Sequence, residues 1–456
     1  RVMRPFLKMW KSAFVYSLYV GLCATNAAAQ TSVIDLKQVY EAALQQDASI
    51  RASRAAADSG RERLPQARAG LLPQVSASAG RNNNNLDTTA PNILGNLSTI
   101  NDKYSSDNRS IQLRQPLMNM QRWLQFQQAK FIVDEAEANL DRDLQNLVVR
   151  VAGAYFETLL ADEQLDLVMA QKSLYTALVD AAKKGLASGS GTRTDVDDAQ
   201  SRLDMAFAME LEARQNQDLT RRQLQLLINQ PVTKLAKLNV NALKLNVPAP
   251  ANLDEWTLKA EQSSPEIKAM EARLEQARRE VSKAQAGHLP TLDAVAQWSN
   301  SGSENITRIN SRYENKSIGL QLNVPLYAGG AVSSSVRQAA ANLAKEQQNL
   351  QMAQNDLTLK VEKELINLQD SQERIQALEV ALASAAQLVV SYTKGILAGT
   401  RTQTDRLNAI QREAEARRDL LQARYQWVLS MVKLKLLCGE SHTGVMEQIN
   451  ASVLAH

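Results

Sequence analysis

Two stretches decide the fold of this 456-residue chain: KKGLASGSGTRTD at Lys183–Asp195 and TKGILAGTRTQTD at Thr393–Asp405. Each contains Lys-Gly, a second glycine four residues later and a closing Thr-Asp. The matched pairs are Gly185 and Gly395, Gly189 and Gly399, and Asp195 and Asp405, always 210 residues apart. A constant offset indicates an internal duplication, so we expect two copies of one structural unit.

The duplication extends well beyond these stretches. LKQVYEAALQQDASI at 36–50 corresponds to LDEWTLKAEQSSPEI at 253–267, and ARAGLLP at 67–73 corresponds to AQAGHLP at 284–290. We therefore predict two structural repeats in the same internal order, joined by a Pro-bounded linker. The predicted boundaries are a signal peptide at 1–29, a first repeat at 30–230, a linker at 231–250, a second repeat at 251–438 and a C-terminal tail at 439–456.

Very long helices dominate each repeat. Residues 119–184 and 331–394 carry apolar residues at helical spacing and contain no proline, and shorter helices are expected at 194–228 and 404–437. At 1.5 Å per residue the first long helix would span about 99 Å. A helix of that length buries its apolar stripe against other long helices, so the pattern predicts a coiled coil.

The glycines of the opening stretches are expected to reverse the chain between these helices. GSGTRT at 189–194 has the glycine content of a phosphate-binding loop, but no Gly-Lys-Ser/Thr follows and the preceding element is helical. Gly185, Gly189, Gly395 and Gly399 are better interpreted as residues that end a helix and form a turn.

A pair of amphipathic strands is predicted before each long helix. Apolar residues alternate with polar ones near 74–80, 111–114, 291–298 and 318–326. The polar segments between them, RNNNNLDTTAPN at 81–92 and SNSGSENITRINS at 299–311, are expected to be exposed loops. One apolar and one polar face suit a barrel wall between lipid and water, but four strands cannot close a barrel, so self-association is expected.

Residues 1–29 have the pattern of a secretory signal, with four basic residues, an apolar segment and Ala27-Ala28-Ala29 before Gln30. Removal of the four basic residues of the predicted signal leaves 48 of the 52 Lys and Arg, which equals the number of Asp and Glu. The remaining chain is therefore near neutral, and its charge indicates no nucleic-acid partner. Three histidines and one cysteine after the signal predict no metal site, no cofactor and no internal disulfide. No later stretch approaches 18 uncharged apolar residues.

Three classes of function are considered for a chain with these sequence features. The first is a passive export duct made of a barrel and a helical tunnel. The second is a periplasmic coiled-coil adaptor, in which the amphipathic segments form a small soluble sheet. An enzyme is the third, and no Ser/His/Asp set, metal cluster or carboxylate pocket can be assembled from these residues.

Four motifs carry a resemblance to a known family. They are AGHLPTLDAVAQ at 286–297, VPLYAGG at 324–330, AYF at 154–156 and AGTRTQTDRLNA at 398–409. With the duplicated plan they resemble the TolC-like outer membrane efflux protein family, from about Ser32 to Glu440. The resemblance implies a mainly α-helical chain with four strands, and a homotrimer with a twelve-stranded barrel in outer membrane lipid and a periplasmic coiled-coil tunnel. It also implies a periplasmic adaptor and an inner-membrane transporter as partners, in efflux or type I secretion.

The same resemblance places a gate at the turns. Asp405 matches an aspartate of an acidic ring, Arg401 matches an arginine that links helices, and Asp195 matches the aspartate that receives such links. Asn408 stands where a second ring aspartate often occurs, and Ile396 where a linking tyrosine can occur. The resemblance therefore implies a ring of three carboxylates per trimer rather than six.

An alternative for these aspartates needs no gate. Asp195 and Asp405 lie near predicted helix N-termini, where acids are favourable, with Thr194 and Thr404 as candidate caps. Asp197 and Asp198 add acid near the first turn and are interpreted as part of a solvated face. The cap and the gate interpretations are compatible.

Overall fold

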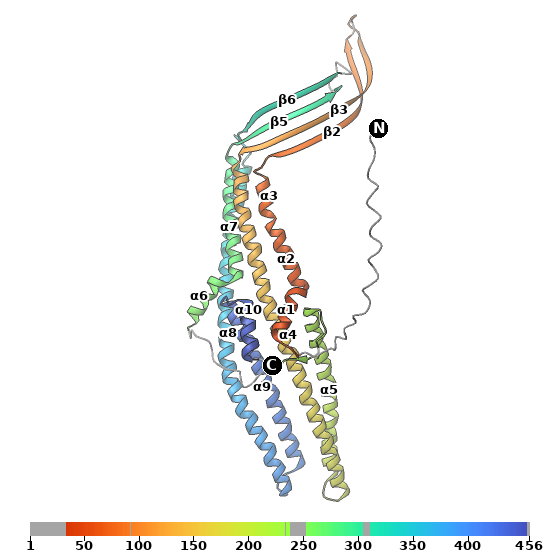
Figure 1. The fold of residues 1–456 in the computed structure, drawn as a ribbon, viewed down its shortest axis with the longest axis vertical. Coiled ribbons are helices and arrows are strands. Elements are labelled where there is room, and N and C mark those ends of the chain that lie inside the picture. Colours follow the sequence, from red (N-terminus) through yellow and green to blue (C-terminus); the bar gives the residue numbers. More distant parts are fainter. Residues whose placement is uncertain (1–32, 92, 233, 238–251, 304–310, 454–456) are drawn as a thin grey trace, which may run out of the picture.

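The computed structural model describes residues 33–91, 93–232, 234–237, 252–303 and 311–453, so the predicted signal peptide and most of the linker lie outside it. The chain is elongated, with helices along the long axis and strands running obliquely at one end (Figure 1). The predicted mainly helical chain with four strands is confirmed.

Two long helices form the body of the molecule. Helix α4 covers Met120–Ala187 and helix α8 covers Ala331–Leu397, with 68 and 67 residues. Each pairs with the helix that follows its turn, α5 at Arg193–Ile228 and α9 at Gln403–Leu437. The two hairpins end side by side at the end of the molecule away from the strands (Figure 1). The duplicated sequence thus forms two equivalent helical hairpins.

Shorter helices line the half of the molecule nearer the strands. They are α1 at Leu36–Gln46, α2 at Ala48–Arg61, α3 at Arg63–Ala69, α6 at Leu253–Ser263 and α7 at Pro265–Gln285, which a 3-10 turn at Ala286–His288 extends. Helix α7 packs on both α4 and α8, while α2 and α3 pack on α4. The Pro and Gly that follow these helices direct the chain into the strands.

The four strands form one antiparallel sheet in the order β2-β3-β5-β6. Their bounds are Gln74–Pro91, Leu97–Met118, Thr291–Gly302 and Arg312–Asn323. Each strand joins a helix, so α3, α4, α7 and α8 continue the strand order as a layer of helices (Figure 1). Strands β2 and β6 are the two edges of the sheet.

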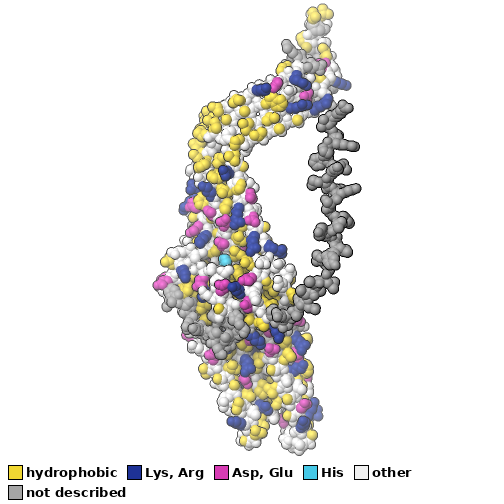
Figure 2. Space-filling view, in the orientation of Figure 1, with side chains coloured by type: hydrophobic (Ala, Val, Ile, Leu, Met, Phe, Trp, Pro, Cys, Tyr) yellow, Lys and Arg dark blue, Asp and Glu magenta, His cyan; other side chains and the backbone are white. Residues whose placement is uncertain are grey.

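The register divides the sheet into an apolar and a polar face. Val75 pairs with Leu113, Leu113 with Ala296, and Ala296 with Ile318, which places these side chains in one row on one face. Neighbouring rows add Ile111, Trp298, Leu320 and Leu322. Figure 2 shows hydrophobic side chains gathered over the strands near the helices, with Lys and Arg nearer the far end.

The prediction of an exposed loop at 81–92 is wrong, because most of this segment is strand. Residues Arg81 to Pro91 pair with Leu97 to Asp107 and extend the β2–β3 hairpin beyond the other two strands. Polar side chains bond across the ribbon, as Asn84 donates to Ser106 (2.8 Å) and Asn101 donates to Asn85 (2.8 Å). A ladder of cross-strand hydrogen bonds supports pairing where an apolar face is missing.

The main core lies at mid-height, where both hairpins meet the short helices. Strand β1 at Val33–Ile34 pairs in parallel with β4 at Lys234–Leu235, beside the buried Tyr155 of α4. The Tyr155 hydroxyl lies 2.9 Å from the Ala236 carbonyl oxygen and 3.2 Å from that of Ile34. Burial raises the pKa of Tyr155, so the hydroxyl keeps its proton and remains a donor.

The segment predicted as a C-terminal tail contains helix α10 at His442–Val453. Its side chains Val445, Met446 and Ile449 are buried in the main core with residues of α1 and α9. The described part of this segment is thus packed against the main core.

One described helix, α8, contains an 18-residue window apolar enough to cross a membrane by length and composition, with a mean hydropathy of 1.4. None of that window is buried within the single chain. A coiled-coil helix with an uncovered apolar face is expected to pack against another helix.

Candidate functional site

The two turns between the long helices have the same backbone geometry. Gly189 and Gly399 have φ of +76° and +72°, a left-handed conformation that strongly favours glycine. The Ser190 N–H donates to the Gly185 carbonyl (2.9 Å), and the Thr400 N–H donates to the Gly395 carbonyl (2.9 Å). This pattern is a Schellman motif, which satisfies carbonyls at a helix end. The predicted role of the glycines in ending the helices is consistent with this geometry.

Each return helix begins with a capping box. The Asp195 N–H donates to the Thr192 hydroxyl (3.2 Å) and the Thr192 N–H donates to the Asp195 carboxylate (2.9 Å). Thr402 and Asp405 repeat this exchange at 3.2 and 3.1 Å. The caps are therefore Thr192 and Thr402, and the prediction of caps two residues later is wrong, because only a threonine three residues before the acid can form the box.

The capping boxes predict acid sensitivity at the turns. Hydrogen bonds from the Thr192 hydroxyl and N–H hold the pKa of Asp195 below its ordinary value, and those from the Thr402 N–H and hydroxyl do the same for Asp405. A lowered folded-state pKa gives stability above the unfolded pKa, which is lost as pH falls through the folded pKa. We expect protection of the first amides of α5 and α9 against hydrogen exchange to fall below about pH 4.

The measurement is protection relative to the intrinsic exchange rate, followed by mass spectrometry as a function of pH. Asp195→Asn and Asp405→Asn are the matched variants, and each should abolish the acid-dependent step at its own turn only. A step that persists in the matching variant would assign the acid sensitivity to other groups.

Beyond the caps, five side chains join the two hairpins, and we call them the tip clasp: Asp198 and Arg202 of α5 with Thr404, Asn408 and Gln411 of α9. Arg202 donates to Asn408 Oδ1 (2.8 Å) and to Gln411 Oε1 (3.2 Å). The Thr404 hydroxyl donates to Asp198 (3.1 Å), whose other oxygen accepts from Arg202 Nε (3.3 Å). The clasp is thus one continuous network across two helices.

A small apolar cluster supports the tip clasp. Its buried members come from three helices: Tyr175, Leu178 and Val179 of α4, Ala199, Leu203 and Ala206 of α5, and Leu407 and Ile410 of α9. The side chains of Arg202 and Asp198 are only 21% and 29% exposed, so the network is partly shielded from solvent. Partial burial makes such hydrogen bonds stronger than those of a fully exposed pair.

The structure brings only some of the predicted site residues together. Asn408 lies in the tip clasp, and Asp198 is bonded there rather than on a solvated face, so that interpretation is wrong. Arg401 lies over the Tyr392 ring, 4.7 Å from its centroid. No hydrogen bond or ion pair joins Asp195 and Arg401 among the described residues of the single chain. Their predicted link stays a prediction.

The sequence contained one signal for the tip clasp that the prediction did not use. Asp198 and Asn408 are 210 residues apart, so they are equivalent positions of the duplication. Equivalent positions on two similar hairpins meet where the hairpins pack side by side. Arg202 has no such signal, because its equivalent, Arg412, is not in the clasp.

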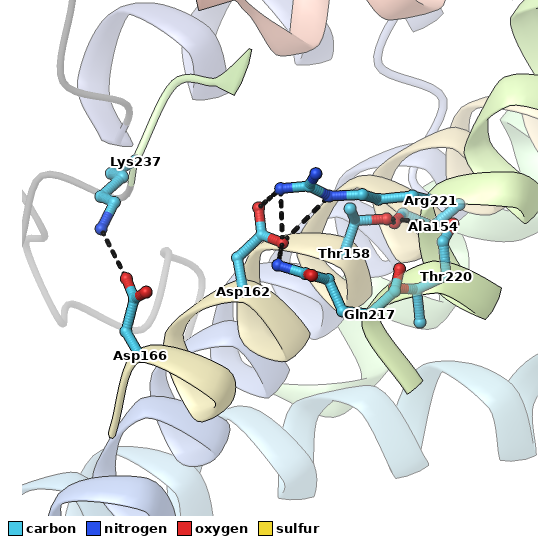
Figure 3. A network of polar contacts seen from close by, with 8 residues as sticks. All are labelled: Ala154, Thr158, Asp162, Asp166, Gln217, Thr220, Arg221 and Lys237. Atoms are coloured by element: carbon cyan, nitrogen blue, oxygen red, sulfur yellow. Dashed lines mark hydrogen bonds and ion pairs between the residues drawn. The ribbon is translucent and has the colours of Figure 1, made fainter. Parts of the chain in front are cut away.

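A second polar network fixes the base of the first hairpin (Figure 3). Arg221 of α5 points toward Asp162 of α4 and donates to both carboxylate oxygens at 3.0 and 3.1 Å. Gln217 donates to the same carboxylate (2.8 Å). Two-point Arg–carboxylate pairs restrict geometry as well as adding stability. The two helices of the first hairpin are therefore joined at its base by a two-point ion pair.

Two equivalent helical hairpins that continue into an amphipathic sheet define the class of envelope export ducts. Residues 39–230 and 256–440 match the family described as outer membrane efflux protein. The chain belongs to the outer membrane efflux protein family.

The chain is similar to several characterised relatives. It is 30% identical over 436 residues to the proteases secretion protein PrtF of Dickeya chrysanthemi, covering 95% of this chain and 94% of PrtF. It is 31% identical to the alkaline protease secretion protein AprF of Pseudomonas aeruginosa, with coverage of 91% and 86%. It is 29% identical to the outer membrane protein TolC of Escherichia coli, with coverage of 92% and 85%.

Solved structures agree on the fold. The CmeC outer membrane channel of Campylobacter jejuni matches with a TM-score of 0.76 at 15% identity, covering 91% of this chain and 89% of CmeC. CusC matches with a TM-score of 0.75 at 18% identity, with coverage of 89% and 92%.

The chain is an outer membrane efflux or secretion channel with a periplasmic extension, and it is not an enzyme. Family membership implies a trimeric channel that works with pump components.

Proposed function

We propose that three copies of this chain close one twelve-stranded barrel in the outer membrane and continue it as a helical tunnel. Each chain supplies four strands whose edges, β2 and β6, carry backbone groups that need partners. Neither edge is tolerated in lipid, and closing the barrel between chains removes both. The uncovered apolar window of α8 gains a helical neighbour in the same assembly.

We propose that the substrate is a polypeptide, exported by a type I system with a periplasmic adaptor and an inner-membrane transporter. The observation that carries this proposal is the pair of relatives named for protease secretion, at 30% and 31% identity over more than nine-tenths of this chain. The solved channels match at 15% and 18% and support the fold alone. A secreted protease is accordingly the substrate class to test.

We propose that the hairpin turns are the periplasmic gate. Asp405 supplies one partly exposed carboxylate per chain, while Asn408 is neutral and accepts a hydrogen bond from Arg202 in the tip clasp. A trimer then has three carboxylates at this level, and such a ring favours cations. In this proposal Arg401 and Asp195 link neighbouring chains, and the tip clasp links the two hairpins within one chain.

The test is expression in a Gram-negative host that lacks its own duct, together with a type I protease, its inner-membrane transporter and its adaptor. We expect protease in the medium, a cross-linked trimer in the outer membrane fraction and stepwise conductance in planar bilayers. Dye or drug export without protease export would overturn the proposal of a polypeptide substrate. It would leave the proposal of an export duct intact. A chain found in the periplasm without conductance would favour the adaptor alternative.

A further inference from the structure

The polar face of the four-stranded sheet carries one charged pair. Over the length of β5, from Thr291 to Gly302, alternate residues on this face of the paired strands are Gln, Ser, Asn, Thr, Gly, Val, Pro and Tyr apart from Arg114 and Asp293. The remaining charged side chains there belong to the apolar face by the same register: Arg81, Asp107, Arg109, Arg312, Glu314 and Lys316. Where β5 and β6 take part in the described sheet, the polar face is therefore uncharged except at this pair, and Asp102 lies on the same face in the two-stranded extension of β2 and β3.

Arg114 and Asp293 contact each other directly. Arg114 Nε donates to Asp293 Oδ2 (3.0 Å), and Nη2 donates to the same oxygen. The Asp293 side chain is 5% exposed, whereas that of Arg114 is 47% exposed. The other Asp293 oxygen, Oδ1, is buried with no hydrogen-bond partner among the described residues. Asp293 is thus a buried carboxylate whose charge is balanced from one side by a half-exposed guanidinium.

The pair lies where the sheet joins the helices. The register shifts between Pro116 and Met118, so Asp293 pairs with Pro116 beside a bulge. Bulges redirect the chain and its side chains at barrel rims. Gln115 donates to the Leu71 carbonyl (3.1 Å) and fixes the adjacent chain segment. The position of the pair is therefore held by the backbone as well as by the ion pair.

We propose that Arg114 and Asp293 determine the charge selectivity of the barrel lumen, an inference that rests on the proposed trimeric barrel. In that barrel the polar face lines the water-filled lumen, and three pairs form a ring at its inner mouth. Arg114 neutralises the buried carboxylate, so the lumen carries no net charge and passes solutes of either sign. With no other charges on this face where β5 and β6 take part in the described sheet, removal of either partner leaves three like charges that set the local potential.

The test measures reversal potentials of purified trimers in planar bilayers under a salt gradient. Arg114→Gln leaves three uncompensated carboxylates, and we expect the cation-to-anion permeability ratio to rise about twofold or more. Asp293→Asn leaves three guanidiniums, and the ratio is expected to fall by a similar factor. The double variant restores neutrality and should return the ratio to the parental value.

Arg109→Gln is the matched control, because Arg109 lies on the same strand but on the apolar face. It should leave the ratio unchanged. A purely structural pair would reduce the yield of trimers without shifts of opposite sign, and parental ratios in both single variants would overturn the proposal. If trimers of Arg114→Gln do not assemble, the result for Asp293→Asn decides the test alone. In that variant the unpaired guanidinium of Arg114 is half-exposed and remains solvated, so the trimer is expected to assemble. A complete lack of channels in the parental protein would instead refute the proposed barrel.

Discussion

Trimers that carry Arg202→Ala are expected to spend far more time open than the parental protein, with higher mean conductance in planar bilayers. The change removes the hydrogen bonds from Arg202 to Asn408 and Gln411 and its contact with Asp198. Each such bond contributes about 0.5–1.5 kcal/mol, and partial exposure places their sum near the lower end. A loss of about 1.5–3 kcal/mol per chain shifts the closed-to-open ratio by about 10- to 150-fold.

Arg193→Ala is the matched control for this prediction. Arg193 is also on α5, but its side chain is 80% exposed and, among the residues that the structure describes, pairs only with Asp197 of the same helix. It should leave conductance unchanged. Arg202→Lys is expected to be intermediate, because a lysine keeps the charge opposite Asp198 but lacks the planar geometry that reaches two amide oxygens at once. Parental conductance in Arg202→Ala would show that the tip clasp does not hold the duct closed.

The long helices and their turns could be predicted from the sequence because local rules determine them. Proline-free segments with helical periodicity gave α4 and α8 to within a few residues, and Gly189 and Gly399 occupy left-handed positions that favour glycine. The caps could also have been found. Thr402 and Asp405 have the Thr-x-x-acid spacing of a capping box, whereas Thr404 directly precedes the acid.

The extended β2–β3 hairpin could not be predicted from local rules. A run of asparagines has low strand propensity, and its pairing depends on cross-strand contacts such as that between Asn84 and Ser106. The tip clasp could not be predicted for the same reason, because Arg202 contacts Asn408 only after two separate hairpins pack together. Tertiary contacts between distant segments decide both features, and a periodicity in one segment does not report them.

Gly439→Ala is expected to destabilise the protein by about 2–5 kcal/mol, the largest effect of a single methyl group that the structure indicates. Gly439 joins α9 to α10 and has a φ of +80°. The Glu440 N–H donates to the Lys435 carbonyl (3.1 Å), as at the tip turns. A Cβ at this position would lie 2.2 Å from the Cβ of Ser263 at the end of α6. The left-handed backbone costs about 1–2 kcal/mol and the overlap about 1–3 kcal/mol.

Gly399→Ala separates the two contributions, because Gly399 has a φ of +72° but a methyl group added there would meet no neighbouring atom within 4 Å. It should show the backbone cost alone. The measurement is thermal unfolding in detergent by far-ultraviolet circular dichroism, together with the yield of trimer. Ser263→Gly removes the overlapping atoms, so in combination with Gly439→Ala it should recover the overlap part of the loss. Equal losses in Gly439→Ala and Gly399→Ala would show that α6 moves aside and that its contact with the α9–α10 turn adds little to stability.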